Sequence, residues 1–477
     1  MPGDIPPEEL RRALHRAADL VADYVDGVGA RDVVPSVEPG EVAARLAPSP
    51  PAQAESLESI LTDYEELIEP NVTHWNHPGF MAYFGISASG PGIVGEMLAA
   101  GLNVNAMLWR TSPAATELEE RACDWLRQMV DLPEVFQGHI NDTASISTML
   151  AIAAARHGLE GLEIRTRGMA GRADLPQLTV YCSDQAHSSV DKAVMTLGIG
   201  HENLRRIPSD DIYQLSLDAL EFAIEADLAA GHRPVAVVAT AGTTSTTSVD
   251  PLSGIAELCE RHGIWLHVDA AYAGSAAICP KLRGYLDGWE RADSVVINPH
   301  KWLFTPFDCS VLLVRDPDLL REAFSLVPEY LRTGESEGTN LMDYGVQLGR
   351  RFRALKLWMV IRRFGVEGLR QRLREHCRLA TELASWIDSE RDLEVMAPVP
   401  FSVVCFRWYR EGLSGVRLDA LNRELLENVN RAGPIFLSHT ELNGRFVLRV
   451  AIGNIKTSEE HVRQAWELIR READRLV

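Results

Sequence analysis

Lysine and basic charge are both scarce in this chain of 477 residues. Lysine and arginine together number 47 against 67 aspartates and glutamates, which gives a formal net charge of −20. A nucleic-acid-binding protein needs a basic surface to neutralise phosphates, so we expect no nucleic-acid partner. The basic residues are almost all arginines, and the few lysines can be considered one by one: Lys192, Lys281, Lys301, Lys356 and Lys456.

Cysteines are few as well, and long apolar runs are missing. The seven cysteines show no CxxC spacing. We therefore expect reduced thiols in a cytoplasmic protein and no disulfide framework. The first residues, MPGDIPPEELRR, lack the apolar core of a secretory signal. Residues 71–95 carry no acidic or basic side chain apart from two histidines, but contain two prolines and five glycines, which predicts a pocket-lining loop rather than a membrane span.

Several common catalytic motifs are absent. The chain has no GxxxxGK[ST] phosphate loop, no GxGxxG after a strand, no HExxH and no Cys/His cluster with zinc spacing. His74 and His77 lie three residues apart beside Pro78. We interpret them as loop or pocket residues rather than metal ligands, and expect no metal.

The order of patterns along the chain predicts an α/β protein. Two amphipathic helices near 10–24 and 57–67 come first, and they need a larger body or a partner subunit to bury their apolar faces. Strands then alternate with helices, which is typical of a mostly parallel sheet. A smaller α+β part follows a long helix to about 390. We predict a helical arm (1–85), a large α/β domain (86–345) and a small C-terminal part (346–477), with buried strands at 178–182, 235–240, 264–268, 294–297 and 310–314.

Lys301 stands out because its surroundings are almost free of charge. In residues 294–307 the only other ionisable side chain is that of His300. An apolar site lowers the pKa of a lysine and makes the neutral amine a nucleophile, which is the condition for a Schiff-base lysine. A lysine that extends to the surface from a strand end fits this segment equally well. The other four lysines lie near charged neighbours or in surface-like helical settings.

Asp269 favours the first interpretation. It ends the predicted strand 264–268, at the strand end where open α/β sheets bind ligands. Small residues follow it, among them Ala271, and would let a flat ring approach the backbone. Pyridoxal phosphate needs such a carboxylate on its ring nitrogen and a lysine on its aldehyde. Residues 142–145 precede a predicted helix and could bind the phosphate, although they also fit an ordinary helix cap.

Ten segments together closely resemble the aromatic-L-amino-acid decarboxylase family, the group II pyridoxal-phosphate decarboxylases. They cover nearly the whole chain and are HPGFMAYF (77–84), SPAATELE (112–119), DTAS (142–145), SDQAHSSV (183–190), ATAGTTS (239–245), HVDAAYAG (267–274), NPHKW (298–302), PEYL (328–331), LGRRFRALK (348–356) and FVLRVAI (446–452). The resemblance implies a fold-type I architecture. It also implies an obligate homodimer, in which the arm wraps the partner and the active site lies at the interface.

The resemblance also implies a role for each matching residue. Lys301 would hold the cofactor's aldehyde, Asp269 would pair with the ring nitrogen and His187 would stack on the ring. Tyr330, on a loop that the glycines of 332–340 make lid-like, would return a proton to the substrate carbon. The cofactor residues are Thr143, Ala144, Ser145, His187, Thr244, Asp269, Ala271, Asn298, His300 and Lys301.

The expected substrate is an aromatic L-amino acid such as phenylalanine, tyrosine or tryptophan. We place Tyr83, Ile86, His187 and Gly349 around its side chain. Ile86 replaces the family's usual Thr or Ser and disfavours hydroxylated rings, while Gly349 leaves room for a large ring. Three alternatives remain: an aldehyde synthase, whose loop has Phe in place of Tyr330, an aminotransferase, and a non-catalytic dimeric binding protein of the same fold.

Overall fold

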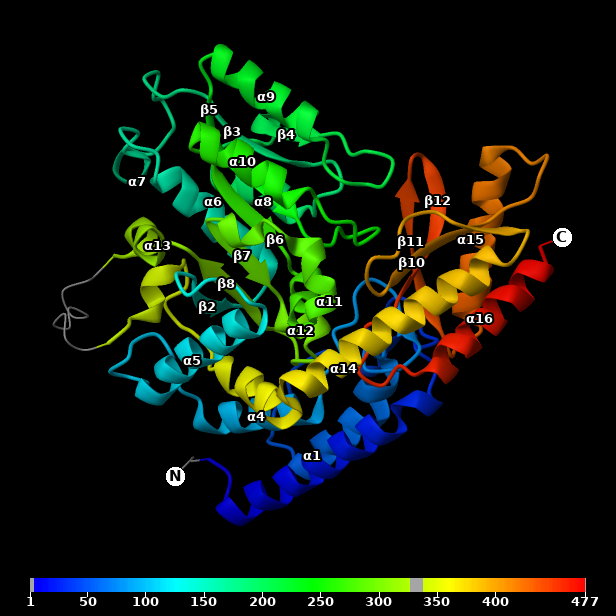
Figure 1. Cartoon of the computed structure of the whole chain (residues 1–477). Coiled ribbons are helices and arrows are strands. Elements are labelled where there is room, and N and C mark those ends of the chain that lie inside the picture. The colour runs from blue at the N-terminus through cyan, green and yellow to red at the C-terminus, as the bar shows by residue number, and fades with distance from the viewer. Residues whose placement is uncertain (1–3, 327–337, 477) are drawn as a thin grey trace.

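The larger sheet carries the elements on which the predicted site depends (Figure 1). The computed structural model of the protein describes residues 4–326 and 338–476. Within these residues seven strands pair in the order β2-β8-β7-β6-β5-β3-β4. Their bounds are β2 Gln137–Asn141, β3 Leu178–Ser183, β4 Leu204–Ile207, β5 Arg233–Thr240, β6 Trp265–Asp269, β7 Ser294–Ile297 and β8 Ser310–Val314.

All five predicted strands of this sheet are present, and the sheet is mostly parallel as predicted. From β7 through β6, β5 and β3 to β4, neighbouring strands run parallel. Strand β8 is antiparallel to both β7 and β2, and this reversal was not predicted because apolar runs carry no information on direction. The carboxyl ends of β3, β5, β6 and β7 therefore meet at one edge of the sheet.

Helices cover both faces of the large sheet, which explains why its strands are apolar throughout. Apolar side chains of α6 (Ala144–His157) and α8 (Ser189–Thr196) pack on one face. Those of α9 (Leu217–Ala229) and α10 (Leu252–His262) pack on the other. The remaining helices around this body are α4 Gly90–Leu102, α5 Pro113–Met129, α7 Ile164–Arg167, α11 Pro280–Arg283, α12 Pro299–Trp302 and α13 Pro317–Phe324.

The C-terminal part forms a second sheet with its own core. Within the described chain its strand order is β1-β11-β12-β10-β9. The strands are β1 Phe80–Met81, β9 Leu393–Val395, β10 Val403–Trp408, β11 Phe436–Leu442 and β12 Arg445–Ala451, and they pack with α14 Ala354–Asp388, α15 Gly415–Arg431 and α16 Glu459–Asp474. Strand β1 pairs with β11 and so ties the predicted arm to this sheet. The division at residues 85 and 345 stays a prediction.

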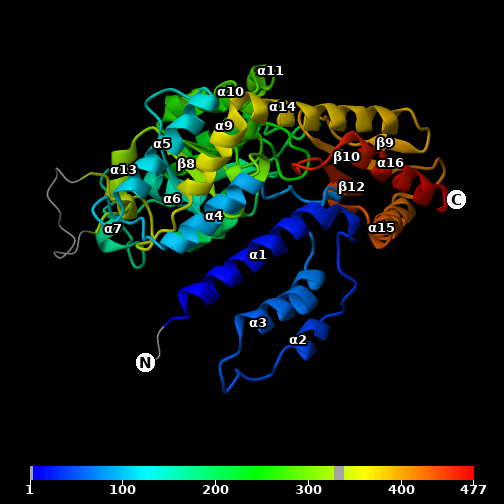
Figure 2. The same cartoon turned by 90° about the horizontal axis from the view of Figure 1, so that it is seen from below.

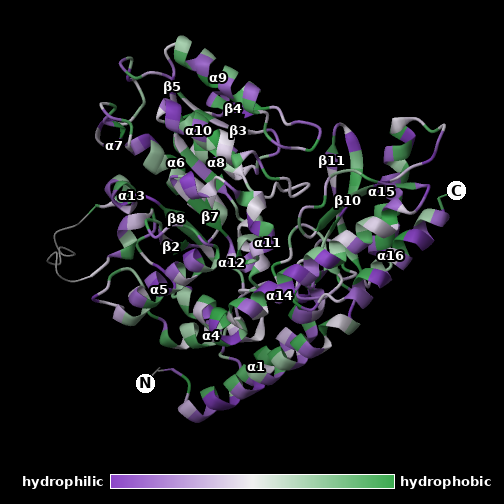
Figure 3. Ribbon diagram, viewed as in Figure 1, coloured by the Kyte–Doolittle hydropathy of each residue, from purple (hydrophilic) through white to green (hydrophobic). Residues whose placement is uncertain are grey.

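The N-terminal helices lie outside both sheets, as Figure 2 shows. They are α1 Pro7–Gly27, α2 Glu41–Arg45 and α3 Leu57–Asp63. Apolar and polar residues alternate along α1 (Figure 3), and Leu10, Leu14 and Val21 expose their side chains. We predicted that these helices need a larger body or a partner subunit to bury their apolar faces. The exposed apolar side chains of α1 agree with that prediction. No helix among the described residues is long and apolar enough to cross a membrane.

Lys356 corrects one expectation from the sequence. We expected a surface-like lysine, but only 1% of it is exposed, and its ammonium pairs with Glu96 of α4. The burial arises because α14 packs against α4, with Gly95 directly against the Lys356 backbone. The sequence around Lys356 is rich in basic residues and does not reveal this helix contact.

Candidate functional site

All ten predicted cofactor residues line one cavity of about 180 Å³ at the carboxyl edge of the parallel strands. The cavity also contains four residues that the sequence analysis did not select. The lining consists of Phe84, Thr143, Ala144, Ser145, His187, Thr240, Gly242, Thr244, Asp269, Ala271, Tyr272, Asn298, His300 and Lys301. Segments far apart in sequence thus meet where open α/β sheets bind ligands.

Lys301 lies in α12, directly after β7, and faces this cavity. Burial lowers the pKa of its amine below the ordinary value, and the nearby positive charge of Arg449 lowers it further, while Asp269 acts in the opposite direction. Its Nζ lies 5.0 Å from the centre of the Phe84 ring. A larger share of neutral amine at a given pH is what a nucleophilic lysine requires. The alternative of a lysine that extends into bulk solvent does not match this position.

Asp269 is the last residue of β6 and is buried. Its Oδ1 accepts a hydrogen bond of 3.1 Å from the backbone N–H of Ala271, which fixes the carboxylate at the strand end. In register it pairs with Thr240 on β5 and Val296 on β7. The carboxylate therefore stands in the middle of the sheet edge, in the same cavity as Lys301.

The N-terminus of α6 provides the anion-binding end of the cavity. Thr143 precedes the helix, but its side chain makes no capping bond to α6. Asp142 instead accepts hydrogen bonds from the Thr143 backbone N–H, at 2.6 Å, and from the Thr143 hydroxyl, at 3.2 Å. The ordinary cap interpretation therefore does not apply, and the positive end of the helix faces the cavity.

Two histidines in the cavity wall have pKa values below the ordinary value of a histidine. Burial lowers the pKa of His187, whose Nδ1 accepts a hydrogen bond of 3.1 Å from the backbone N–H of Ser189. Burial lowers the pKa of His300 to about 3, and its Nδ1 accepts from the Cys309 N–H at 2.9 Å. With Nδ1 as acceptor, each neutral ring carries its proton on Nε2, where it can donate a hydrogen bond.

Several residues in and beside the cavity were not among the predicted site residues. Phe84 and Tyr272 stack on each other with ring centres 4.0 Å apart, and both lie inside segments already quoted for the resemblance. Arg449 is buried with its guanidinium carbon 4.6 Å from the centre of the Phe84 ring. Its Nη2 has no hydrogen-bond partner among the described residues. The arginine in FVLRVAI was the available signal, but nothing local connects β12 to this cavity.

The predicted substrate residues are not all brought together. His187 lines the cavity, whereas Tyr83, Ile86 and Gly349 are not among its lining residues. Tyr83 is 57% exposed, although the next residue, Phe84, forms part of the wall. Tyr330 and most of its predicted lid lie outside the described residues, so its role stays a prediction.

The cavity fits pyridoxal phosphate in its donor set. Thr240 Oγ1 and Asn298 Oδ1 are buried in its wall without a hydrogen-bond partner in the described part of the chain. The helix N-terminus complements a phosphate, the carboxylate complements a protonated ring nitrogen, and the amine of lowered pKa complements an aldehyde. The residues that would hold the three groups are Thr143, Ala144 and Ser145, then Asp269, and then Lys301.

Comparisons with known proteins agree with this site. The model of the pyridoxal-dependent decarboxylase conserved domain matches residues 39–409. The chain is 42% identical to phenylacetaldehyde synthase of Arabidopsis thaliana, covering 98% of this chain and 97% of that protein. It is 41% identical to tryptophan decarboxylase 2 of Oryza sativa subsp. japonica, over 98% and 95%.

Among solved structures, the crystal structure of Oryza sativa TDC with PLP and tryptamine superposes with a TM-score of 0.95 at 39% identity. The match covers 100% of this chain and 99% of that one. The architecture is therefore fold type I of the pyridoxal-phosphate enzymes. With the cavity around Lys301, these matches show that the chain belongs to the pyridoxal-dependent decarboxylase family.

Proposed function

We infer that this protein is a pyridoxal-phosphate-dependent carboxy-lyase that converts an aromatic L-amino acid to its amine and carbon dioxide. The observation that carries this function is one cavity containing the Lys301 amine, the Asp269 carboxylate and the N-terminus of α6. When bound, the cofactor accepts the electron pair that the departing carbon dioxide leaves behind.

The chain's own residues bind, orient and move protons. Lys301 would hold the cofactor through its amine, yield that position to the amine of the substrate and recover it by displacing the product amine. Asp269 keeps a proton on the ring nitrogen, because a carboxylate beside that nitrogen favours its charged form. His187, which lies in the cavity wall, would stack on the ring and orient the substrate over it. Tyr330 is proposed to deliver a proton to the substrate carbon.

We propose that Tyr83, Ile86 and Gly349 contact the substrate side chain. Isoleucine cannot hydrogen-bond a ring hydroxyl, so position 86 favours an unsubstituted aromatic ring. An added Cβ at Gly349 would approach only Asn105 Nδ2, at 3.9 Å. A small side chain at position 349 can therefore be accommodated by the fold of this chain, and its effect on turnover would report contact with the substrate.

An amine-release screen over the twenty amino acids, dopa and 5-hydroxytryptophan tests this proposal. We expect kcat/KM for the best aromatic substrate to exceed that for glutamate by about 10²–10³-fold, because an apolar pocket leaves a carboxylate unpaired. A preference for glutamate would contradict the pocket built on Ile86 and Gly349.

Gly349→Ser should lower kcat/KM for tryptophan by about tenfold and for phenylalanine less, because added volume penalises the larger ring.

A second function is favoured by a specific similarity. The chain is as close to a phenylacetaldehyde synthase as to a tryptophan decarboxylase. Such a synthase decarboxylates its substrate and also deaminates it oxidatively. The family resemblance associates this activity with Phe on the loop, and this chain has Tyr330 there. We therefore propose the decarboxylase as the principal activity.

We further propose that the protein is an obligate homodimer and acts in the cytoplasm, where its seven free cysteines stay reduced. Leu10, Leu14 and Met97 line an open hollow of about 620 Å³ between α1 and α4. Leu98 and Leu102 of α4 are exposed as well. A second copy would cover these side chains, consistent with the arm exchange that the family resemblance implies.

Leu14→Glu tests the dimer directly. In light scattering the unmodified protein should show twice the chain mass of 52.8 kDa. The variant, which places a charge in the apolar hollow, should dissociate about 10²-fold more readily and lose activity with the dimer. The matched control is Phe222→Glu on α9, because Phe222 is 74% exposed and α9 lies far from α1 (Figure 1). Equal masses for both variants would remove α1 from the interface.

A further inference from the structure

His267 connects the strand that carries Asp269 with helix α6, whose N-terminus lines the phosphate end of the cavity. It is fully buried on β6, two residues before Asp269, so both side chains point to the same face of the sheet. That face is covered by α6, whose N-terminus lines the phosphate end of the cavity. His267 Nε2 lies 3.3 Å from Thr148 Oγ1 of α6. One imidazole thus connects the strand that bears Asp269 to the phosphate-binding helix.

The orientation of this imidazole is fixed on its other side. His267 Nδ1 lies 2.8 Å from Ser294 Oγ on β7. The Trp265 indole N–H also donates to Ser294 Oγ, at 2.9 Å, and an indole nitrogen can only donate. Ser294 Oγ therefore connects His267 to Trp265 of the same strand, and the two ring nitrogens of His267 contact Ser294 on β7 and Thr148 on α6.

Thr148 lies within the first turns of α6. It is four residues after Ala144, which corresponds to about 6 Å along the helix axis. Its side chain is completely buried against the sheet. The neighbouring Ser147 makes a second link, with its Oγ 3.1 Å from Ser310 Oγ on β8. The helix end that faces the cavity is therefore held to the sheet by side-chain hydrogen bonds and not by apolar packing alone.

We propose that His267 is a positioning residue that fixes the distance between the phosphate-binding end of α6 and the Asp269 carboxylate. The proposal rests on the proposed function, in which Asp269 takes the cofactor's ring nitrogen and α6 its phosphate. A rigid spacing lets one ligand satisfy both ends at once, so binding at one end favours binding at the other. Without the His267–Thr148 contact, α6 still binds the phosphate and Asp269 still binds the ring nitrogen, but binding of one group favours binding of the other less strongly.

The test compares pyridoxal phosphate with pyridoxal, which has the same ring and aldehyde but no phosphate. Each ligand is titrated into the cofactor-free full-length chain, and the ratio of the two dissociation constants is measured. His267→Leu and Thr148→Val each remove the same bond from one end. We expect each to lower the preference for pyridoxal phosphate about fivefold, the scale of one buried hydrogen bond. The affinity for pyridoxal should change less than about twofold, because Lys301 and Asp269 remain.

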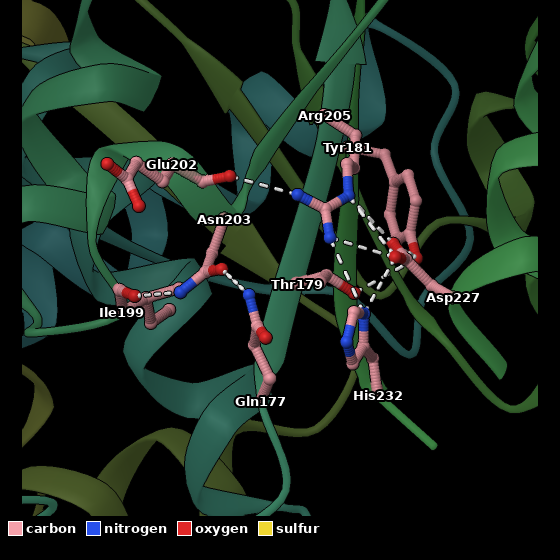
Figure 4. Close-up of polar contacts among 9 residues, drawn as sticks. All are labelled: Gln177, Thr179, Tyr181, Ile199, Glu202, Asn203, Arg205, Asp227 and His232. Carbon is pink, nitrogen blue, oxygen red and sulfur yellow. Dashed lines mark hydrogen bonds and ion pairs between the residues drawn. The ribbon is translucent and has the colours of Figure 1, made fainter. Parts of the chain in front are cut away.

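The double variant separates this link from independent damage. Both substitutions break the His267–Thr148 contact, so adding Thr148→Val to His267→Leu should lower the ratio no further, although His267→Leu also removes the contact with Ser294. The matched control is Thr179→Val, which removes a buried hydrogen bond of 2.9 Å between Thr179 and Tyr181 on the same sheet (Figure 4). That network joins Tyr181, Asp227, Arg205 and His232 and includes no residue of the cavity wall. The control should lower the melting temperature and leave the ratio unchanged.

The outcomes distinguish a failure of the proposed role of His267 from a failure of the proposed function. If pyridoxal phosphate and pyridoxal weaken equally in Thr148→Val, the link supports only the fold and the proposal is overturned. The same holds if the ratio stays unchanged. If His267→Leu does not fold, Thr148→Val decides alone, since valine matches the shape of threonine. Failure of the unmodified chain to bind either ligand would instead contradict the proposed function.

Discussion

Lys301→Ala should change the visible spectrum of the reconstituted protein and abolish its turnover. The variant keeps Asp269 and the N-terminus of α6, so pyridoxal phosphate should still bind, but without a covalent bond. We expect kcat/KM for the preferred amino acid to fall by more than about 10³-fold, the scale of losing a covalent nucleophile. Absorption spectra and amine release measure the two effects. Borohydride treatment of the unmodified protein should leave a reduced adduct at position 301, found by peptide mass spectrometry.

The control for this experiment is Lys281→Ala. Lys281 lies exposed on α11, outside the cavity, and its removal takes away one lysine without touching the site. Its spectrum and activity should match those of the unmodified protein. An unchanged visible spectrum in Lys301→Ala would instead contradict the Schiff-base role and favour a binding protein that keeps the fold. Turnover that needs a 2-oxoacid and releases no carbon dioxide would indicate an aminotransferase.

Part of the predicted cofactor site follows from local sequence, whereas His187, Thr244, Asn298 and His300 were selected by the family resemblance alone. Asp269 and Lys301 each follow a short apolar run, and the carboxyl ends of parallel strands meet at one edge of a sheet. Thr143 and Ser145 stand at the start of a helix, where backbone N–H groups are free to bind an anion. Each position is therefore determined by the strand or helix beside it, and the topology brings them together.

The missed features all depend on contacts between distant segments. Arg449 enters the wall of the site from β12 of the small sheet, and its guanidinium donates to the backbone carbonyls of Ser245 and Tyr83. Lys356 was predicted to lie at the surface, and it is buried because α14 packs against α4. The direction of β8 depends on its pairing with β7 and β2, which are distant or separate segments of the chain. None of these follows from periodicity or from the charge of near neighbours.

The substrate residues form an intermediate case. Tyr83, Ile86 and Gly349 were selected by resemblance, and they are not among the residues that line the cavity. Tyr83 and Leu348 expose large apolar surfaces next to elements of the site. This pattern is expected if the substrate pocket is completed by a second copy of the chain. The Leu14→Glu variant therefore tests the pocket as well as the oligomer, because dissociation should also remove activity.

The product depends on whether a proton or oxygen reaches the substrate carbon after carbon dioxide leaves. Protonation of that carbon gives the amine. If it stays unprotonated, oxygen can oxidise it: one amino acid, one oxygen and one water then give one aldehyde and one each of carbon dioxide, ammonia and hydrogen peroxide. A phenolic O–H at position 330 can donate the proton, whereas phenylalanine cannot. Residue 330 is therefore the point at which the two activities of this family's members would separate.

Tyr330→Phe should shift the product from amine to aldehyde. Loss of a positioned proton donor slows amine formation by about 10²–10⁴-fold, so even a slow oxygen reaction becomes competitive. Amine, aldehyde, ammonia and hydrogen peroxide are measured against carbon dioxide in air, and again without oxygen, where the aldehyde should disappear. The matched control is Tyr344→Phe, because Tyr344 lies beside His139 and outside the cavity lining. That variant should keep releasing amine. An unaltered product ratio in Tyr330→Phe would remove Tyr330 as the proton donor while leaving the roles of Lys301 and Asp269 intact.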